Sequence, residues 1–252
     1  MISKNQIKLI RSLELKKNRK REGLFVAEGP KVVGDLLRAG YKTYALFATC
    51  EYPNAQLISD DELHRISFLQ HPQEVLAVFE IPSSTPIATP HSQKENPQPS
   101  TLHSQLSLAL DGVQDPGNVG TIIRIADWFG IDTIYCSLDT ADVYNPKVVQ
   151  ATMGSLAHVQ IVYTDLVELL TDSDIPIYGT LLDGKNIYEQ EFDSHKGIIV
   201  MGNEGNGISP EVRKLITQKL FIPNFHEGTE TAESLNVAIA TAITCSEFRR
   251  RV

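Results

Sequence analysis

The 252-residue chain is poor in cysteine, and its few thiols are not arranged for metal or disulfide chemistry. Cys50, Cys136 and Cys245 lie far apart, match no zinc-ligand spacing and make no even disulfide set. We therefore expect no metal site, and we expect three buried thiols in a reducing cytoplasm.

Long apolar runs are also missing. No stretch approaches the roughly 20 apolar residues that span a bilayer, and residues 1–5 lack the apolar core of a signal peptide. With 42% hydrophobic and 21% charged residues, the composition is that of a globular protein. The sequence predicts a soluble, cytoplasmic protein with no membrane partner.

Excess positive charge is the third absence. The formal net charge is −8, which disfavours nonspecific binding to nucleic acid. The distribution is uneven, however, because residues 1–25 hold only two carboxylates beside eight cations: Lys4, Lys8, Arg11, Lys16, Lys17, Arg19, Lys20 and Arg21. A basic end on an acidic body indicates a localised contact with a polyanion. A solvated helix face is the alternative.

Proline separates the chain into two parts. Five of the thirteen prolines fall in residues 82–104, among Ser, Thr, Gln and Asn, a composition typical of a linker. Residues 1–81 read as a small α/β unit, with helices at 1–22, 31–39 and from Asp60, and strands at 24–26, 43–49 and 75–81. We expect domains at 1–81 and 105–252.

The second part alternates strands with helices. Strands are predicted at 106–110, 133–137, 158–162, 176–181, 197–201 and 220–223, with helices beginning near residues 119, 146, 165, 209 and 234. This order predicts a parallel sheet covered by helices on both faces. The final helix, 234–248, is apolar nearly all round, so we expect it to be buried or to form a dimer interface.

A glycine-rich turn follows the strand that ends near Met201. Gly202, Gly205 and Gly207 surround the single carboxylate of Glu204 just before a helix. Open α/β sheets bind ligands at such a turn, although a tight turn without a ligand is the simpler reading. The G-x-G-x-x-G order of dinucleotide-binding folds is absent.

Two polar residues stand out on the helix predicted from Val119. Asn118 is placed to cap that helix. Arg124 lies on the helix face opposite Ile122 and Ile125. An exposed pair between Arg124 and Asp127 is the plain alternative.

Three segments in order carry a family resemblance: Asp115-Pro-Gly-Asn-Val-Gly with Arg124 downstream, Met201-Gly-Asn-Glu-Gly-Asn-Gly-Ile, and Ile222-Pro followed by Glu233-Ser-Leu-Asn-Val-Ala. Together they resemble the motifs of SpoU/TrmH RNA ribose 2′-O-methyltransferases, in the SPOUT superfamily. Residues 1–81, with Phe25-Val-Ala-Glu-Gly, resemble an L30e-like RNA substrate-binding domain. One departure is the long acidic loop 225–233, beside the pocket that the family implies.

The resemblance implies an α/β fold with a deep C-terminal trefoil knot, a homodimer packed at the knot, and S-adenosylmethionine as cofactor. Matched by position, the cofactor residues are Thr180, Gly202, Ile222 and Leu235, and the catalytic residues are Asn118, Arg124, Glu204, Ser234 and Asn236. The implied activity is methylation of a ribose 2′-hydroxyl in structured RNA, with rRNA favoured over tRNA.

We interpret Arg124 as a cation that grips phosphate, because a guanidinium hardly deprotonates in proteins. Two other functions stay open. One is an inert RNA-binding or ribosome-assembly protein on the same fold. The other is a nucleotide-dependent oxidoreductase.

Overall fold

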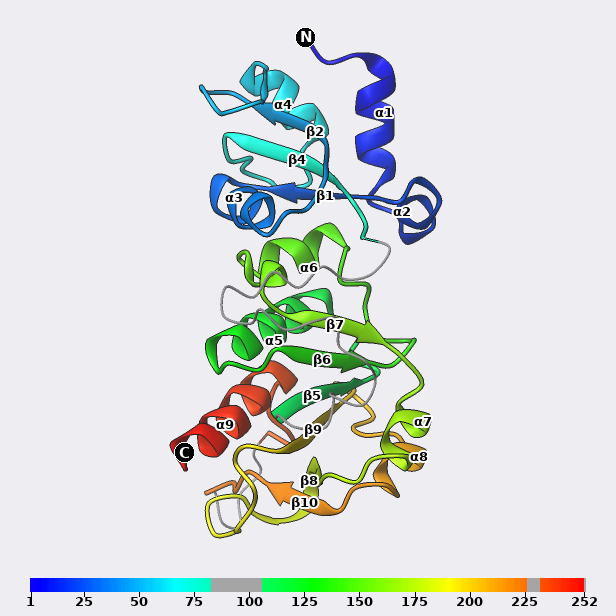
Figure 1. Cartoon of the computed structure of the whole chain (residues 1–252), viewed down its shortest axis with the longest axis vertical. Coiled ribbons are helices and arrows are strands. Elements are labelled where there is room, and N and C mark those ends of the chain that lie inside the picture. The colour runs from blue at the N-terminus through cyan, green and yellow to red at the C-terminus, as the bar shows by residue number, and fades with distance from the viewer. Residues whose placement is uncertain (83–105, 226–231, 252) are drawn as a thin grey trace. The chain divides into compact units, whose positions relative to one another are not determined.

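Two sheets organise the chain, each in a compact unit of its own (Figure 1). The computed structural model describes residues 1–82, 106–225 and 232–251. The first unit holds the described residues up to 82 together with Asp142–His158, and the second holds the rest. Residues 83–104 of the expected linker and residues 226–231 of the acidic loop 225–233 lie outside the described residues.

The first unit contains a mixed sheet in the order β1-β4-β2-β3. β1 and β2 run antiparallel to β4, and β3 runs parallel to β2. Its elements are α1 (Lys4–Ser12), α2 (Lys16–Glu22), β1 (Leu24–Glu28), α3 (Pro30–Arg38), β2 (Thr43–Ala48), β3 (Gln56–Leu57), α4 (Asp60–Ile66), β4 (Val75–Glu80), α6 (Pro146–Ala151) and η2 (Ser155–Ala157). Ser3 and Ser59 begin α1 and α4 with full capping boxes.

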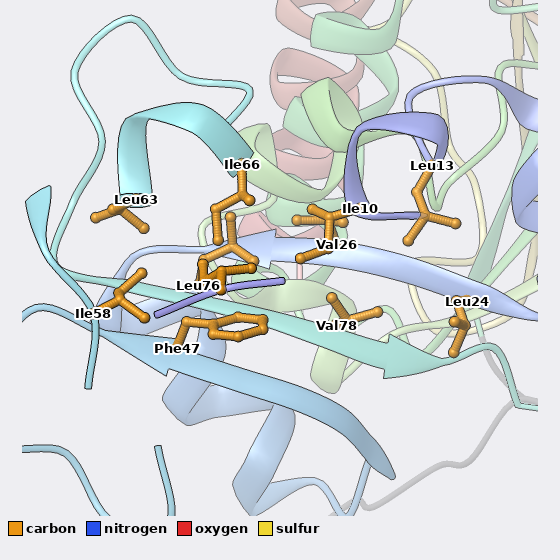
Figure 2. Close-up of a cluster of buried hydrophobic side chains, with 11 residues drawn as sticks. Ile10, Leu13, Leu24, Val26, Phe47, Ile58, Leu63, Ile66, Leu76 and Val78 are labelled. Carbon is orange, nitrogen blue, oxygen red and sulfur yellow. The ribbon is translucent and has the colours of Figure 1, made fainter. Parts of the chain in front are cut away.

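One apolar cluster fills the space between this sheet and helices α1 and α4. Figure 2 shows side chains from both helices meeting those of the strands. Ile10, Leu13 and Ile66 are at most 2% exposed, as are Leu76 and Val78 beneath them. Burial of such side chains contributes about 1.5–3 kcal/mol each, so this cluster accounts for the fold of the unit.

The single helix expected over residues 1–22 is in fact two. α1 ends at Ser12 and α2 begins at Lys16 because buried side chains take the carbonyls that a continuous helix would use. The Asn18 amide donates to Ser12 O at 2.8 Å, and Arg19 Nη1 donates to Leu13 O and Glu14 O, both at 2.8 Å. The prediction was therefore wrong at the turn between them.

Arg19 is also the one expected phosphate contact that is not at the surface. It is 1% exposed and donates from Nε and Nη2 to Asp142 Oδ2 at 3.0 and 2.6 Å. Asp142 opens the segment Asp142–His158, which packs with the first unit although it follows β6 (Thr133–Cys136) in the chain. Within that segment, the centroid of the Tyr144 ring lies 4.7 Å from the centroid of the Phe25 ring. The predicted division at 82–104 therefore differs from the observed units in this segment.

The second unit contains a six-stranded parallel sheet in the order β10-β8-β9-β5-β6-β7. Its elements are β5 (Leu106–Asp111), α5 (Pro116–Trp128), β6 (Thr133–Cys136), β7 (Gln160–Tyr163), α7 (Leu166–Thr171), β8 (Ile177–Asn186), β9 (Gly197–Gly202), α8 (Pro210–Arg213), β10 (Gln218–Phe221) and α9 (Val237–Arg250). Figure 1 shows α5 and α9 on one face and α7 and α8 on the other. The predicted parallel α/β class is confirmed, and the trefoil knot stays a prediction.

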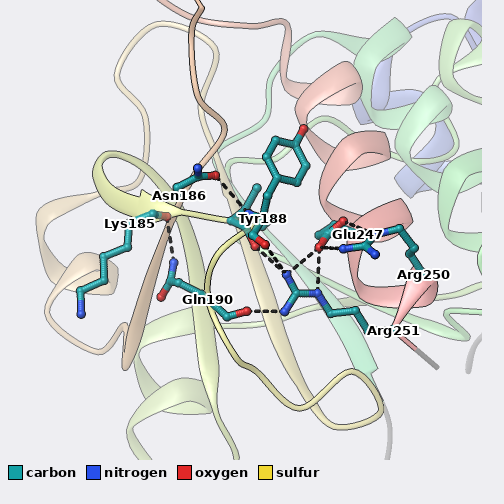
Figure 3. A network of polar contacts seen from close by, with 8 residues as sticks. Lys185, Asn186, Tyr188, Gln190, Glu247, Arg250 and Arg251 are labelled. Atoms are coloured by element: carbon teal, nitrogen blue, oxygen red, sulfur yellow. Dashed lines mark hydrogen bonds and ion pairs between the residues drawn. The ribbon is translucent and has the colours of Figure 1, made fainter.

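A polar network fastens the end of α9 (Figure 3). Glu247 is 5% exposed and accepts from Arg250 and Arg251. These bonds outweigh burial, so the pKa of Glu247 lies below its usual range. Arg251 also donates to the carbonyls of Gln190 and Ile187. The last described residue thus fixes the segment that follows β8.

Two of the three cysteines are buried as expected. Cys136 and Cys245 are buried, and burial raises the pKa of each thiol to about 12. Cys50 is exposed, contrary to expectation, because it lies in the bend that follows β2. Within the three described stretches, no helix is both long and apolar enough to cross a membrane.

Candidate functional site

The site lies where neighbouring parallel strands of the second sheet end. β5 and β9 finish in register, with Asp111 opposite Gly202. Carboxyl ends of parallel strands share one edge, which is where open α/β sheets bind ligands. Asp111 Oδ2 accepts from the backbone N of Ser209 at 2.6 Å, so the end of β5 holds the start of α8. Asp111 was not anticipated.

Loop 203–207, between β9 and α8, is closed on itself by Asn203. The backbones of Asn203 and Gly207 exchange two hydrogen bonds of 2.9 Å. The Asn203 Oδ1 accepts from Gly205 N and Asn206 N at 2.9 and 3.0 Å, while its Nδ2 donates to Gly112 O at 2.7 Å. Sequence reasoning missed Asn203, although an Asn beside glycines is a known signal for a side chain that bonds the backbone two residues on.

Gly202 is required at the entry of this loop by close backbone packing. A Cβ at this position would lie 2.3 Å from both Gly207 C and Ile208 N. Because those are main-chain atoms, no side-chain rotation could relieve the contact. The glycine predicted here as a cofactor residue therefore also determines the loop shape.

Glu204 joins the loop to the start of α5. Its Oε2 accepts from Gln114 N at 3.2 Å, and its Oε1 accepts from Asp115 N and Asn118 Nδ2, both at 3.1 Å. Partial burial opposes ionisation, but the hydrogen bonds, first that of Asn118, outweigh it and hold the pKa of Glu204 below its usual range. The carboxylate is therefore an anionic acceptor and not a proton donor at neutral pH.

Asn118 is not the helix cap that its position suggested. α5 begins at Pro116, and Asp115 caps it by accepting from Asn118 N at 2.8 Å. A proline at the first helical position fixes that register. The Asn118 side chain is thereby free of capping and donates to Glu204 instead.

Asn236 extends the same chain of hydrogen bonds. Its Nδ2 donates to Asn118 Oδ1 at 2.9 Å. Its Oδ1 caps α9 by accepting from Ala238 N and Ile239 N at 3.0 and 3.3 Å. Glu204, Asn118 and Asn236 therefore form one polar relay, which we call the amide relay, from the β9 loop through α5 to α9.

A cavity of about 550 Å³ opens beside the loop. All four predicted cofactor residues line it, Thr180, Gly202, Ile222 and Leu235, together with Glu204 and Ser234 of the predicted catalytic group. Asn118, Arg124 and Asn236 are not among its lining residues. Its volume is in the range of pockets for small-molecule and cofactor ligands.

One wall of this cavity is formed by residues of β8 that have no register partner on a neighbouring strand. In the described part of the sheet, β8 pairs with β9 up to Gly179 and with β10 at Gly179 and again at Lys185. Residues 180–184 therefore have no ladder neighbour, and residues 180–183 line the cavity. Backbone groups are obligatory hydrogen-bonding groups, so this stretch can bind a ligand through its main chain.

Charged side chains that were not anticipated stand at the same wall. Asp183 Oδ2 contacts Arg213 Nη2 at 2.7 Å and Lys219 Nζ at 2.9 Å. The hydrogen bond from Lys219 contributes most to a pKa of Asp183 below its usual range. Asp183 and Arg213 both line the cavity, which also contains Glu233.

The structure does not bring Arg124 to the cavity of its own chain. Arg124 is exposed on α5, six residues after Asn118, while Ile122 and Ile123 on the other face are buried. The expected burial of the last helix is only half correct. Ile239 is 52% exposed on α9, whereas Thr241 and Cys245 are fully buried.

Comparison with known proteins agrees with this geometry. The SpoU rRNA Methylase family model matches residues 105–246, and the MRM3-like substrate binding domain model matches residues 4–77. A Bacillus subtilis protein named 23S rRNA (guanosine(2553)-2′-O)-methyltransferase RlmP is 29% identical over 98% of this chain and 97% of its own length.

Solved structures resemble the whole chain. A TrmH-family protein from Porphyromonas gingivalis is 44% identical, covers 100% of both chains and has a TM-score of 0.84. An AdoMet-bound rRNA methyltransferase from Sinorhizobium meliloti is 29% identical over 100% of this chain and 97% of that one, with a TM-score of 0.82. The chain belongs to the SpoU rRNA methylase family.

Proposed function

We propose that this protein methylates a ribose 2′-hydroxyl of RNA with S-adenosylmethionine as donor, and that the RNA is ribosomal. The observation that carries the proposal is the amide relay standing beside a cavity lined by all four expected cofactor residues. The choice of rRNA is supported by the relatives named as 23S rRNA 2′-O-methyltransferases.

The cavity suits a cofactor that joins an apolar heterocycle to a cationic centre. Apolar side chains such as Leu181, Ile208 and Leu220 line it beside residues 180–183, which have no register partner on β9 or β10. Glu204 and Glu233 supply carboxylates, which favour positive charge, whereas Asp183 is already paired with Arg213 and Lys219. When bound, S-adenosylmethionine supplies an electrophilic methyl group on a sulfonium.

The residues of this chain align the acceptor and do not attack the substrate. Glu204 and Asn118 orient one another, and Asn236 ties that pair to α9. Alignment alone lowers the activation free energy of such a reaction by up to about 7–11 kcal/mol. Arg124 stays cationic and holds the phosphate beside the target ribose, and the 2′-hydroxyl proton passes to phosphate or water.

RNA contact is assigned to the first unit. Lys4, Lys8, Lys16, Lys17 and Lys20 are exposed on α1 and α2. These lysines can neutralise phosphates, whereas the neighbouring Arg19 is buried.

The activity test uses ribosomal RNA from a strain that lacks the gene. Incubation with the protein and labelled S-adenosylmethionine is expected to add one 2′-O-methyl group, mapped by the resistance of its linkage to alkali. Asn118→Ala is expected to bind the cofactor and lose turnover. If the wild type binds RNA but transfers no methyl group, the inert RNA-binding protein is favoured. If it binds NADH and not S-adenosylmethionine, the oxidoreductase is favoured.

We also propose a homodimer whose sites are shared. Arg124 is exposed on α5, and exposed apolar side chains accompany it on α5 and at the start of α9: Trp128 at 84%, Leu235 at 49% and Ile239 at 52%. Contact between such surfaces in two copies would bring Arg124 of one chain to the cavity of the other.

Mixed dimers test the shared site. Arg124→Ala keeps its cavity, and Gly202→Val disturbs the cavity because its Cβ meets main chain at 2.3 Å. Each is inactive alone, and each is first shown to fold and dimerise. Purified mixed dimers regain up to one working site if Arg124 acts across the interface, and they stay inactive if it acts within its own chain.

A further inference from the structure

A second cavity lies in the first unit, and no residue of the three motifs lines it. Its volume is about 770 Å³, and its lining includes Gly34, Leu37, Arg38, Tyr44, Tyr52 and Asn54. The lining comes from α3, β2 and the turn that follows β2. Two tyrosines and an arginine face a shared space beside leucine and proline.

Tyr44 is placed here by a β-bulge. Thr43 pairs with Phe79 and Ala45 with Val78, so Tyr44 is an inserted residue without a partner on β4. Bulges of this kind redirect a side chain and stop further strand pairing. Tyr44 is 56% exposed. A large aromatic ring held at the surface by a bulge is available for contact with a ligand.

Gly34 forms the floor of the cavity. It lies inside α3, where glycine is less favourable than alanine. The position of its missing Cβ is 3.3 Å from Arg38 Nη1 and 3.8 Å from Tyr52 Oη. The guanidinium and the phenol therefore meet over a helix surface that has no side chain of its own.

The charge of the cavity is modest. Arg38 is exposed and paired with Asp35, which also accepts from Lys31 Nζ at 2.9 Å. Lys42, next to the bulge, is exposed. A ligand that is mainly anionic would find few free cations here, whereas a flat heterocycle beside one phosphate would find rings, an amide and a guanidinium.

We propose that this cavity, which we call the Tyr44 groove, binds an unpaired base of the RNA substrate. The inference rests on the proposed function, because it names where that RNA is held. Proteins recognise single-stranded RNA by stacking bases on tyrosine rings and on guanidinium planes. Tyr44 and Tyr52 supply the rings, Arg38 supplies the guanidinium, and Asn54 supplies hydrogen bonds to a base edge. Strand addition by a peptide is disfavoured by the bulge.

The test measures binding of the full-length chain to a fluorescein-labelled single-stranded RNA and to protein-free rRNA from the deletion strain. Tyr44→Ala is expected to weaken binding roughly 5- to 100-fold, while Tyr44→Phe keeps the ring and stays near wild type. Gly34→Ala is the sharpest variant, because it fills the floor while improving the helix. It should weaken RNA binding without lowering the melting temperature.

Two controls separate the outcomes. Tyr188→Ala removes an exposed tyrosine of the other unit and should leave RNA binding unchanged. S-adenosylmethionine binding, measured by calorimetry, should be unaffected by every variant. If the wild type methylates rRNA and the Tyr44 and Gly34 variants bind and methylate it equally well, the groove inference fails and the proposed function stands.

Two further results bear on the groove. If these variants lose activity only on ribosomal particles and not on protein-free rRNA, the groove contacts a protein and the inference is overturned. Ultraviolet cross-links from the RNA to Tyr44 or Tyr52, found by mass spectrometry, would support it. If the wild type transfers no methyl group to any RNA, the proposed function fails whatever the groove binds.

Discussion

Charged side chains hold separate segments together through hydrogen bonds both around Arg19 and Glu28 and in the loop around Glu204. They are buried in the first region and exposed in the second. Glu28 is 5% exposed and accepts from the Ser67 hydroxyl and from Phe68 N, which fixes the turn after α4. Glu204 accepts from two backbone N–H groups and an amide, and it is exposed.

The two carboxylates have pKa shifts of opposite sign because hydrogen bonds outweigh desolvation only at Glu204. Desolvation raises the pKa of Glu28 although Ser67, Phe68 and Arg11 oppose it. For Glu204, desolvation is outweighed by the hydrogen bonds, so its pKa is lowered. Burial therefore disfavours the charge of Glu28 in the folded first unit, while hydrogen bonds keep Glu204 ionised at the site.

The largest effect is expected from Arg19→Met. Removing one partner of a buried ion pair costs roughly 3–5 kcal/mol, and this change also leaves Leu13 O and Glu14 O without their donor. Thermal unfolding of the full chain measures the loss. Lys17→Met, an exposed cation of the same helix, is the matched control and should alter stability by no more than about 0.5 kcal/mol.

Glu204→Gln should separate function from stability. The carboxylate accepts through both oxygens, whereas the amide has one acceptor and places an NH2 group opposite either Gln114 N or the Asn118 amide, so the loop and Asn118 shift relative to one another. We expect turnover to fall about 100-fold, which is the effect of a misplacement of about 1 Å, while RNA affinity changes little. Glu28→Gln is the matched control and should leave turnover unchanged. Full turnover in Glu204→Gln would show that the relay does not position the reaction.

The pH dependence of stability should differ in sign between the same two variants. Because the folded pKa of Glu28 is raised above 4.5, its contribution is present below that pH and is lost as pH rises through the folded value. Glu28→Gln should therefore gain stability relative to wild type as pH rises above about 4.5. For Glu204, whose pKa is lowered, the contribution is lost as pH falls, so Glu204→Gln should lose relative stability as pH rises.

Urea titrations of both variants from acid to neutral pH measure these slopes. Each slope is at most about 1.4 kcal/mol per pH unit for a single group. Slopes of the same sign for the two variants would contradict the comparison.

The smallest effects are expected from the exposed lysines of α2. Replacing Lys16, Lys17 and Lys20 by Gln should flatten the salt dependence of rRNA binding by roughly 0.7–0.9 for each phosphate contact that is lost. Arg19 makes no such contribution to the slope because its guanidinium is occupied by Asp142. Truncation of residues 1–100 is a poorer test, since it would expose the buried residues of Asp142–His158.

Local features of the sequence were sufficient for much of the architecture. The alternation of apolar strands with amphipathic helices predicted the parallel sheet, since each element's period is encoded in neighbouring residues. The glycine turn around Glu204 was also predictable, because its glycines and its carboxylate lie within a few residues of one another. The four expected cofactor residues, which the family resemblance and not the local pattern supplied, line one cavity.

Only the tertiary structure decided which distant groups meet. Asn118 seemed a helix cap because nothing nearby in sequence revealed Glu204, 86 residues away, or Asn236, 118 residues away. Arg19 seemed a surface cation because its partner Asp142 lies 123 residues further along the chain. A side chain's local pattern reports its propensity, whereas its burial and its hydrogen-bond partners depend on the packing of segments that the chain brings together only when it folds.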